Sequence, residues 1–275
     1  MSPSPMPDAP ASRRPIITFE NVTKRYGRVV AVDNVSMSID EGEFFALLGP
    51  SGCGKTTMMS MLAGFQKPTT GQVLFDNAPV KGPGPERGVI FQEYGVFPWL
   101  TVRQNIAFGL TLNANHVPPA QRDDICDHYL SLMGLSDFAN SYPKHLSGGM
   151  RQRLAIARAY AVKPQFLLMD EPFGALDAQT RANMQNLLLQ VLAAEGKTVM
   201  LITHSVEEAI YLASRIVVVT ARPARIKEII DVPFAYPRDE SVHERPEFGQ
   251  LRSYIRELVM SEYRAQQAQA ASFSE

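Results

Sequence analysis

A glycine-rich segment with a single lysine directly follows an apolar run. Residues 44–58 read FFALLGPSGCGKTTM. Four of these residues match the spacing G-x-x-x-x-G-K-[ST], namely Gly49, Gly54, Lys55 and Thr56. In such a loop the backbone N–H groups surround the phosphates of a nucleotide, the lysine reaches the β and γ oxygens, and the hydroxyl reaches Mg²⁺. Glycine suits the loop because a side chain would block this close approach.

A helix is expected directly after the loop, over Lys55–Ala63. The unpaired N–H groups and the dipole at its N-terminus favour anions. We therefore expect the whole loop to contact the nucleotide, which comprises Gly49, Pro50, Ser51, Gly52, Cys53, Gly54, Lys55, Thr56 and Thr57. A bulky thiol reagent on Cys53 is then expected to crowd out the phosphates, and bound ATP is expected to protect this thiol.

Two carboxylates end a second apolar run, FLLMDEP at residues 166–172. An aspartate at the carboxyl end of a strand beside a phosphate loop can hold the Mg²⁺ shell, which is the role predicted for Asp170. Glu171 could then polarise the attacking water as a general base. An acidic loop after a buried strand would look the same, so this interpretation depends on the phosphate loop.

Two more polar side chains end predicted strands. His204, in LITHS, could orient the water and sense the γ-phosphate. Gln92, in GVIFQEYG, ends a strand in the same way, although a glutamine alone carries little information. Together with the carboxylates they predict a hydrolytic site at the carboxyl edge of a sheet.

A second glycine-bearing helix start lies at LSGGMRQRLAIARA, residues 146–159. Ser147, Gly148 and Gly149 immediately precede the predicted helix, so its N-terminus could also bind an anion. An ordinary serine cap followed by glycines is the simpler alternative. One chain rarely needs two phosphate sites for one nucleotide, so the pair raises a question that the residues alone leave open.

Strands and helices alternate along most of the chain, which predicts an α/β fold with a parallel sheet covered on both faces. Predicted strands are Ile16–Val22, Ser36–Ile39, Glu43–Leu48, Gly71–Phe75, Gly88–Phe91, Phe166–Met169, Thr198–Thr203 and Ile216–Val219. Predicted helices are Thr101–Leu112, Ala120–Met133, Asp137–Ala139, Gly149–Ala161, Ala178–Ala194 and Val206–Ala213. The helical block at about 101–142 looks inserted into the sheet. An apolar stripe over residues 248–259 predicts a C-terminal helix docked on the main domain.

The composition restricts the possible partners and the cellular compartment. Lys and Arg number 27 against 28 Asp and Glu, giving a net charge of −1, so there is no electrostatic footprint for nucleic acid. Two cysteines are too few for a disulfide framework and fit a reducing compartment. No apolar run approaches the ~20 residues that span a bilayer. Residues 1–15, rich in proline and small residues, are expected to form a disordered tail rather than a signal peptide.

From about Ile16 to Ala221 the ordered set of motifs resembles the ATP-binding cassette (ABC) ATPases. The resemblance implies a P-loop NTPase (RecA-like) core with an N-terminal antiparallel β subdomain and an inserted α-helical subdomain at about 97–155. It implies an ATPase domain over 16–240 and a C-terminal helix and tail over 241–275. It also implies ATP and Mg²⁺ as cofactors.

The resemblance assigns a role to each motif. Residues 49–57 match the Walker A segment and 166–171 the Walker B segment, with Glu171 as catalytic base, Gln92 as the Q-loop glutamine and His204 as the switch histidine. Gln92 joins Thr56 and Asp170 as a metal contact. Residues 146–150 match the signature, except that Met150 replaces the usual glutamine. Two further nucleotide contacts are implied, the adenine-stacking Tyr26 and Asp177 of the D-loop, whose first position is Gly174 where serine is common.

Members of the family work as dimers with ATP between one subunit's Walker A loop and the other's signature, which accounts for the two phosphate sites. The resemblance implies a homodimer on the cytoplasmic face of the inner membrane, peripheral to integral permease subunits and served by a solute-binding protein. Gln92–Leu100 would act as the hinge that passes movement to the permease. Nucleic acid is not an expected partner.

Two segments, FQEYGVFPWLTVRQNIAFGL and VVVTARPARI, resemble the importer branch that handles nitrate, aliphatic sulfonates and taurine. We therefore expect uptake of a small anionic solute. The alternatives are an importer ATPase for another small organic solute, such as a thiamine precursor, and a soluble ABC ATPase that does not serve transport. A P-loop kinase or GTPase would not need the Ser147–Gly149 element, and no Asn-Lys-x-Asp guanine reader is present.

Overall fold

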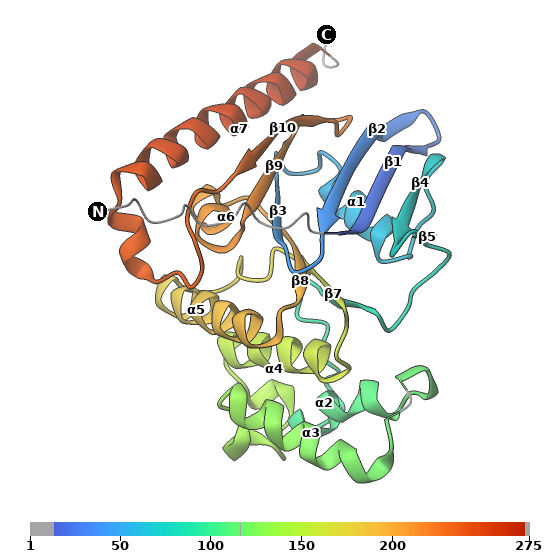
Figure 1. The fold of residues 1–275 in the computed structure, drawn as a ribbon, viewed down its shortest axis with the longest axis vertical. Helices are drawn as coiled ribbons and strands as arrows, with labels where there is room; N and C mark the ends of the chain where they lie inside the picture. The colour runs from blue at the N-terminus through green and yellow to red at the C-terminus, as the bar shows by residue number, and fades with distance from the viewer. Residues whose placement is uncertain (1–13, 116, 273–275) are drawn as a thin grey trace, which may run out of the picture.

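The computed structural model describes residues 14–115 and 117–272 of the chain. Its described strands form two sheets, one of six strands in the order β10-β9-β3-β8-β7-β6 and one of four in the order β2-β1-β4-β5 (Figure 1). The six-stranded sheet contains β3 (Phe44–Leu48), β6 (Arg87–Ile90), β7 (Phe166–Asp170), β8 (Thr198–Thr203), β9 (Arg215–Val219) and β10 (Ile226–Asp231). The expectation for residues 1–13 lies outside the described residues.

The central strands of the larger sheet are buried on both faces. Strand β3 pairs in parallel with β8 and β9, and β7 pairs in parallel with β6 and β8. Alternate side chains of β3 enter two different hydrophobic clusters, one with Ala46 and one with Leu47, because successive residues point to opposite faces. The predicted parallel sheet is present, and β10, which the sequence did not reveal, adds an antiparallel edge to β9.

The N-terminal sheet is antiparallel. Its strands are β1 (Pro15–Tyr26), β2 (Val29–Asp40), β4 (Thr70–Phe75) and β5 (Ala78–Pro79). The two long strands are joined at Gly27, whose φ of 58° suits glycine at a tight turn. Helix α1 (Lys55–Leu62) lies between this sheet and the larger one, and its methionines fill the shared cluster (Figure 1).

Helices α4 (Gly148–Ala161), α5 (Ala178–Glu195) and α6 (Val206–Leu212) lie against the other face of the larger sheet, and α2 (Val102–Thr111) and α3 (Pro119–Leu132) pack against α4. Short 3₁₀ turns occur at Asn113–Asn115, Ser136–Phe138, Pro143–His145 and Glu240–Glu244. Thr101 begins α2 with a capping box shared with Gln104. The helix predicted at Asp137–Ala139 is one of the 3₁₀ turns. Figure 1 shows α2 and α3 at the lower end, away from the two sheets.

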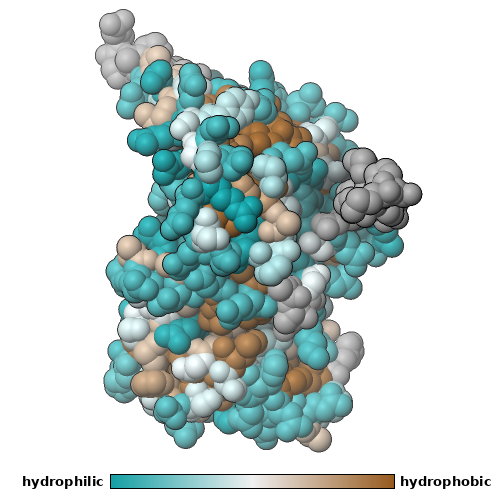
Figure 2. Space-filling model, turned by 60° about the vertical axis from the view of Figure 1, so that its left-hand side comes forward, coloured by the Kyte–Doolittle hydropathy of each residue, from teal (hydrophilic) through white to brown (hydrophobic). Residues whose placement is uncertain are grey.

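The last helix, α7 (Pro246–Ser272), is much longer than the apolar stripe that predicted it. Phe248, Ile255 and Val259 are buried in the same cluster as α6, so the stripe does dock on the main domain. Hydrophilic residues cover most of the face in Figure 2, where hydrophobic residues form separate patches. Among the described residues, no helix combines the length and hydrophobicity needed to cross a membrane.

Candidate nucleotide-binding site

The phosphate loop follows the carboxyl end of β3 and leads directly into α1, as the sequence predicts. Two of its glycines are required by their surroundings. A Cβ on Gly49 would lie 2.6 Å from Val219 Cγ2. A Cβ on Gly54 would lie 2.6 Å from the carbonyl oxygen of Ala31, and its φ of 125° is one that side chains rarely adopt. The neighbouring residues therefore leave no room for a side chain at these two positions.

Lys55 is folded back into the loop. Its Nζ donates to the carbonyl oxygens of Gly49 (2.7 Å) and Pro50 (2.9 Å), and the residue is only 5% exposed. These bonds satisfy a buried ammonium group that would otherwise be costly. They also hold one positive charge inside the loop, where the phosphates of a nucleotide would lie.

The thiol of Cys53 does not face the phosphate side of the loop. It is fully buried in the cluster beneath the loop, with α1 and the N-terminal sheet around it. Burial raises the pKa of this thiol, while nearby Lys55 opposes the shift. The expected protection by bound ATP assumed a thiol on the phosphate side, whereas the structure buries this thiol beneath the loop. Only the backbone of Cys53 can contribute to anion binding.

Thr56 and Asp170 meet at the start of α1 and the end of β7. The Thr56 Oγ1 donates to Asp170 Oδ2 over 3.0 Å. Burial raises the pKa of Asp170, as does the adjacent Glu171 carboxylate, whereas the Thr56 hydroxyl lowers it. One hydroxyl and one carboxylate are oxygen donors of the kind that hold Mg²⁺ together with substrate phosphates. No cluster of three or more His, Cys, Asp or Glu side chains suited to a metal occurs among the described residues.

Glu171 and His204 come together from the ends of two neighbouring strands. His204 Nδ1 lies 3.2 Å from Glu171 Oε2. Glu171 has a left-handed backbone with φ of 46°, held by its N–H bond to the carbonyl oxygen of Ile202 at 2.9 Å. Such a conformation costs a non-glycine residue on the order of 1–3 kcal/mol and is concentrated at functional sites.

A cavity of about 590 Å³ joins these elements. Its lining includes Tyr26, Gln92, Glu171 and much of the phosphate loop, so sequence-distant residues predicted to act together are brought together. Tyr26 is 45% exposed, and its hydroxyl bonds to Gln66. An exposed ring at the mouth of the cavity is available to stack on a base.

Two residues of this region carry no sequence signal. Gln66 lies in an irregular segment, and only its bond to the Tyr26 hydroxyl reveals it. Arg222, in the turn between β9 and β10, lines the cavity and donates to the carbonyl oxygen of Gly52 from Nη2 at 2.8 Å. The motif TARPAR shows a turn with arginines, but nothing in it indicates which arginine faces the phosphate loop.

The signature residues lie apart from the phosphate loop in the same chain. Ser147 caps α4 by accepting from the Met150 N–H at 3.3 Å. Gly149 fits closely, since a Cβ there would be 2.5 Å from Thr180 Cγ2. Asp177 caps α5 by accepting from the Thr180 N–H at 3.0 Å, which lowers its pKa. None of Ser147, Gly148, Gly149 and Asp177 lines the 590 Å³ cavity.

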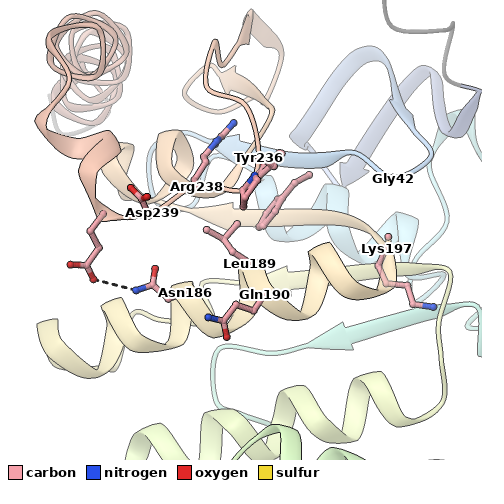
Figure 3. Close-up of a pocket in the computed structure, with 12 residues that line it drawn as sticks. Gly42, Asn186, Leu189, Gln190, Lys197, Tyr236, Arg238 and Asp239 are labelled. Atoms are coloured by element: carbon pink, nitrogen blue, oxygen red, sulfur yellow. Dashed lines mark hydrogen bonds between the residues drawn. The ribbon is translucent and has the colours of Figure 1, made fainter.

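A larger cavity, of about 820 Å³, lies elsewhere. Figure 3 shows Asn186, Leu189 and Gln190 of α5 facing Tyr236 and Arg238 of the segment after β10. Residues 42 and 197, which line it, precede β3 and β8, so it lies at the amino ends of the strands. Ligands of open α/β sheets bind at the carboxyl ends, where the phosphate loop is.

Comparisons with known proteins agree with this geometry. The sequence profile of the ABC transporter family matches residues 32–174. An ATP-binding protein of Brucella abortus is 54% identical over 242 residues, 88% of this chain and 92% of the relative. The nitrate import ATP-binding protein NrtD of Synechococcus elongatus is 43% identical over 82% of this chain and 84% of the relative. The taurine import ATP-binding protein TauB of Roseobacter denitrificans is 42% identical over 88% of this chain and 93% of the relative.

Among solved structures, a dimeric ATP-binding cassette in a post-hydrolysis state, bound to ADP and Pi, matches with a TM-score of 0.68 and 31% identity. The match covers 80% of this chain and 100% of that one. The expected fold, a P-loop NTPase core with an antiparallel β subdomain, is confirmed. The chain therefore belongs to the ABC transporter family, as an ATP-binding and ATP-hydrolysing subunit.

Proposed function

We propose that two copies of this chain hydrolyse Mg-ATP at their shared interface and thereby drive uptake of a small anionic solute through a separate permease. The main support for a dimer is that the two anion sites of one chain are separated. The phosphate loop lines the cavity, whereas the glycine-bearing start of α4 does not. A second copy that presents its Ser147–Gly149 segment would complete the site, and the related cassette with ADP and Pi is itself dimeric.

Within each site the residues divide into binding and chemical roles. The loop amides and Lys55 hold the phosphates, and Tyr26 stacks on the adenine. Glu171 accepts a proton from the attacking water, and His204, 3.2 Å from it, keeps that carboxylate in place. Gln92 lines the same cavity and orients the water and the metal shell. Asp177 would meet the nucleotide across the interface.

The donor set at the end of β7 fits Mg²⁺. Thr56 Oγ1 and Asp170 Oδ2 are oxygen donors 3.0 Å apart beside the phosphate loop. Mg²⁺ held by these two residues would supply positive charge to offset the negative charge that develops as the phosphoryl group transfers. The role of this chain is to hold one hydroxyl and one carboxylate in register, with the Asp170 carboxylate deprotonated.

An aromatic surface next to Gln92 suits the permease. Trp99 is 69% exposed, and its ring lies 5.4 Å from that of Phe97, which is 4.6 Å from that of Phe108. Buried Asn105 fixes this segment by donating to the carbonyl oxygens of Phe97 (3.1 Å) and Leu100 (3.0 Å). Exposed aromatic rings on a held backbone are typical of interaction sites.

This surface joins the cavity to the helical region. The chain runs from Gln92 through the aromatic segment to α2, and Tyr94 has a left-handed φ of 60° where it turns. We assign the helical subdomain to about 97–155 within an ATPase domain over 16–240, followed by the C-terminal region 241–275. With a permease docked there, the chain would lie at the cytoplasmic face of the inner membrane.

The solute class is supported by relatives. Import ATPases for nitrate and taurine are 43% and 42% identical to this chain over most of its length. Nitrate is a small anion, and taurine is a small zwitterion that carries an anionic sulfonate group. The Brucella abortus relative at 54% identity is described only as an ATP-binding protein, and it neither favours nor opposes this class.

Deletion of the gene from its host tests the function. Uptake of labelled taurine, ethanesulfonate, nitrate and a thiamine precursor would be measured in the deletion strain, with wild-type chain or Glu171→Gln supplied in trans. We expect uptake of taurine, ethanesulfonate or nitrate to be lost and to return only with the wild type. Loss of thiamine-precursor uptake instead would replace the anion with the alternative solute. No change in any uptake would favour a soluble ATPase outside transport.

A further inference from the structure

The tip of the phosphate loop accepts hydrogen bonds from two side chains that the proposed chemistry does not use. Gln266 of α7 donates from Nε2 to the carbonyl oxygen of Ser51 over 3.1 Å. Arg222 donates to the carbonyl oxygen of Gly52, from Nη2 at 2.8 Å and from Nε at 3.2 Å. Two consecutive carbonyl groups of the loop are therefore held by side chains from the C-terminal part of the chain.

The geometry of the peptide bond gives these contacts a consequence. In a trans peptide the C=O of one residue and the N–H of the next point in opposite directions, because the unit is planar. A fixed direction of the Ser51 carbonyl therefore fixes the opposite direction for the Gly52 N–H, and a fixed Gly52 carbonyl does the same for the Cys53 N–H. The Cys53 N–H does point across the loop, toward the Pro50 carbonyl oxygen at 3.4 Å.

Helix α7 also holds the turn that carries Arg222. Glu262 Oε2 accepts from the Ala221 N–H at 2.9 Å, and its other oxygen accepts from Lys227 Nζ at 2.6 Å. The Glu262 side chain is 13% exposed, so this ion pair is largely shielded from solvent. One helix thus contacts the loop directly through Gln266 and indirectly through Glu262 and the Arg222 turn.

We propose that Gln266 and Arg222 are positioning residues for the phosphate-binding amides, and that α7 thereby sets the affinity of the site for nucleotide phosphates. Glycine at position 52 makes this support necessary. Its φ of 72° is accessible to glycine at little cost, and the same freedom lets the two peptide units rotate when nothing holds them. A loop already held in its binding conformation loses less entropy when the phosphates bind, so it binds them more tightly.

The test for Gln266 compares Gln266→Ala with Gln267→Ala, its exposed neighbour on the same helix. We expect Gln266→Ala to weaken ADP binding in calorimetric titration of the full chain by about threefold to tenfold, the usual effect of one hydrogen bond. The KM for ATP should rise by a similar factor, with kcat at saturation and the melting temperature unchanged. Gln267→Ala should leave all four quantities unchanged.

Equal ADP affinity in Gln266→Ala and Gln267→Ala would overturn the proposal for α7. A fall in kcat with unchanged KM would also overturn it, because a positioned amide acts on binding before turnover. These readouts do not depend on the solute or the permease, so failure here would leave the proposed transport function intact.

For Arg222, the hydrogen bond must be separated from the positive charge. Arg222→Gln keeps a side-chain donor for the Gly52 carbonyl and removes the charge, whereas Arg222→Ala removes both. We expect Arg222→Ala to weaken ADP binding and Arg222→Gln to restore most of the affinity. If Arg222→Gln is as weak as Arg222→Ala, the guanidinium acts on the phosphates by charge and the positioning role is wrong. Arg225→Ala, in the same turn but paired with Asp33, is the matched control.

Discussion

His204 Nδ1 lies 3.2 Å from Glu171 Oε2, at the point where two neighbouring parallel strands end. Glu171 follows β7 and His204 follows β8, and the register of this pair sets Asp170 opposite Ile202. The side chains therefore meet because of strand pairing, although 33 positions separate them in the sequence numbering. The contact leaves the carboxylate facing the cavity and gives it a fixed neighbour.

Glu171→Gln tests the proposed base directly. The amide keeps the shape of the side chain but cannot accept a proton from water, so phosphate release should fall by about 10²- to 10⁴-fold. ATP binding, measured by titration, should remain within about threefold of the wild type, since the phosphate loop is unaltered. Glu207→Gln, an exposed glutamate at the start of α6, serves as the control. Near-normal hydrolysis by the Glu171 variant would remove this residue from the mechanism.

The contact between the two residues predicts that their substitutions are not additive. If His204 acts by holding Glu171, then His204→Ala should lose turnover, and the double variant with Glu171→Gln should be no slower than Glu171→Gln alone. The measurement is single-turnover phosphate release from all three proteins. A further loss in the double variant would give His204 a role of its own.

Ser147→Arg tests the site across the dimer interface. A long cation at the start of α4 should block the approach of a second chain, so turnover should fall by about a hundredfold or more. ADP binding to the phosphate loop should stay within about threefold, because Ser147 does not line that cavity. Loss of the cap costs about 1 kcal/mol of stability, and Ser147→Ala measures this cost separately. Equal loss of binding and turnover would contradict the two-chain arrangement.

The sequence was sufficient to predict those parts of the site that depend on the local spacing of residues. The phosphate loop, the strand that carries Asp170 and the serine cap of α4 all follow from short motifs with defined backbone requirements. Contacts from distant segments that carry no motif were not accessible in this way. Arg222 and Gln266 reach the loop only because β9, β10 and α7 pass beside it, and β10 itself pairs antiparallel at an edge that no periodic pattern revealed.

The burial of the two thiols also depends on packing that the sequence does not show. Cys53 is fully buried and Cys126 is 1% exposed, and burial raises the pKa of both. Because the thiolate is the reactive form, both should react with a maleimide about a hundredfold or more slowly than a free thiol at pH 7. ATP should change the Cys53 rate only through overall stabilisation, and denaturant should expose both thiols together. Fast labelling of Cys53 that ATP blocks would mean that its thiol faces the phosphates after all.

Asp170→Asn should separate stability from activity. Burial raises the pKa of Asp170 above its ordinary 3.8, so the folded chain holds a proton there more tightly than the unfolded chain does. The free energy of unfolding contributed by this group therefore increases as pH falls through the raised pKa, and the charged form is a cost at neutral pH. Asparagine removes that cost, so the nucleotide-free variant should be more stable than the wild type at pH 7. The difference should vanish under acidic conditions.

The same substitution should abolish Mg²⁺-dependent turnover, since a neutral amide is a poor ligand for a hard cation. In the wild type, protons compete with Mg²⁺ for the carboxylate, so the Mg²⁺ concentration needed for half-maximal hydrolysis should rise as pH falls toward the raised pKa. Denaturant titrations and Mg²⁺ titrations at several pH values measure the two effects on one pair of proteins. If Asp170→Asn were less stable at pH 7, the carboxylate would be a structural anchor. The buried charge would then carry no cost in stability. That cost is the sign that Asp170 is retained for function and not for folding.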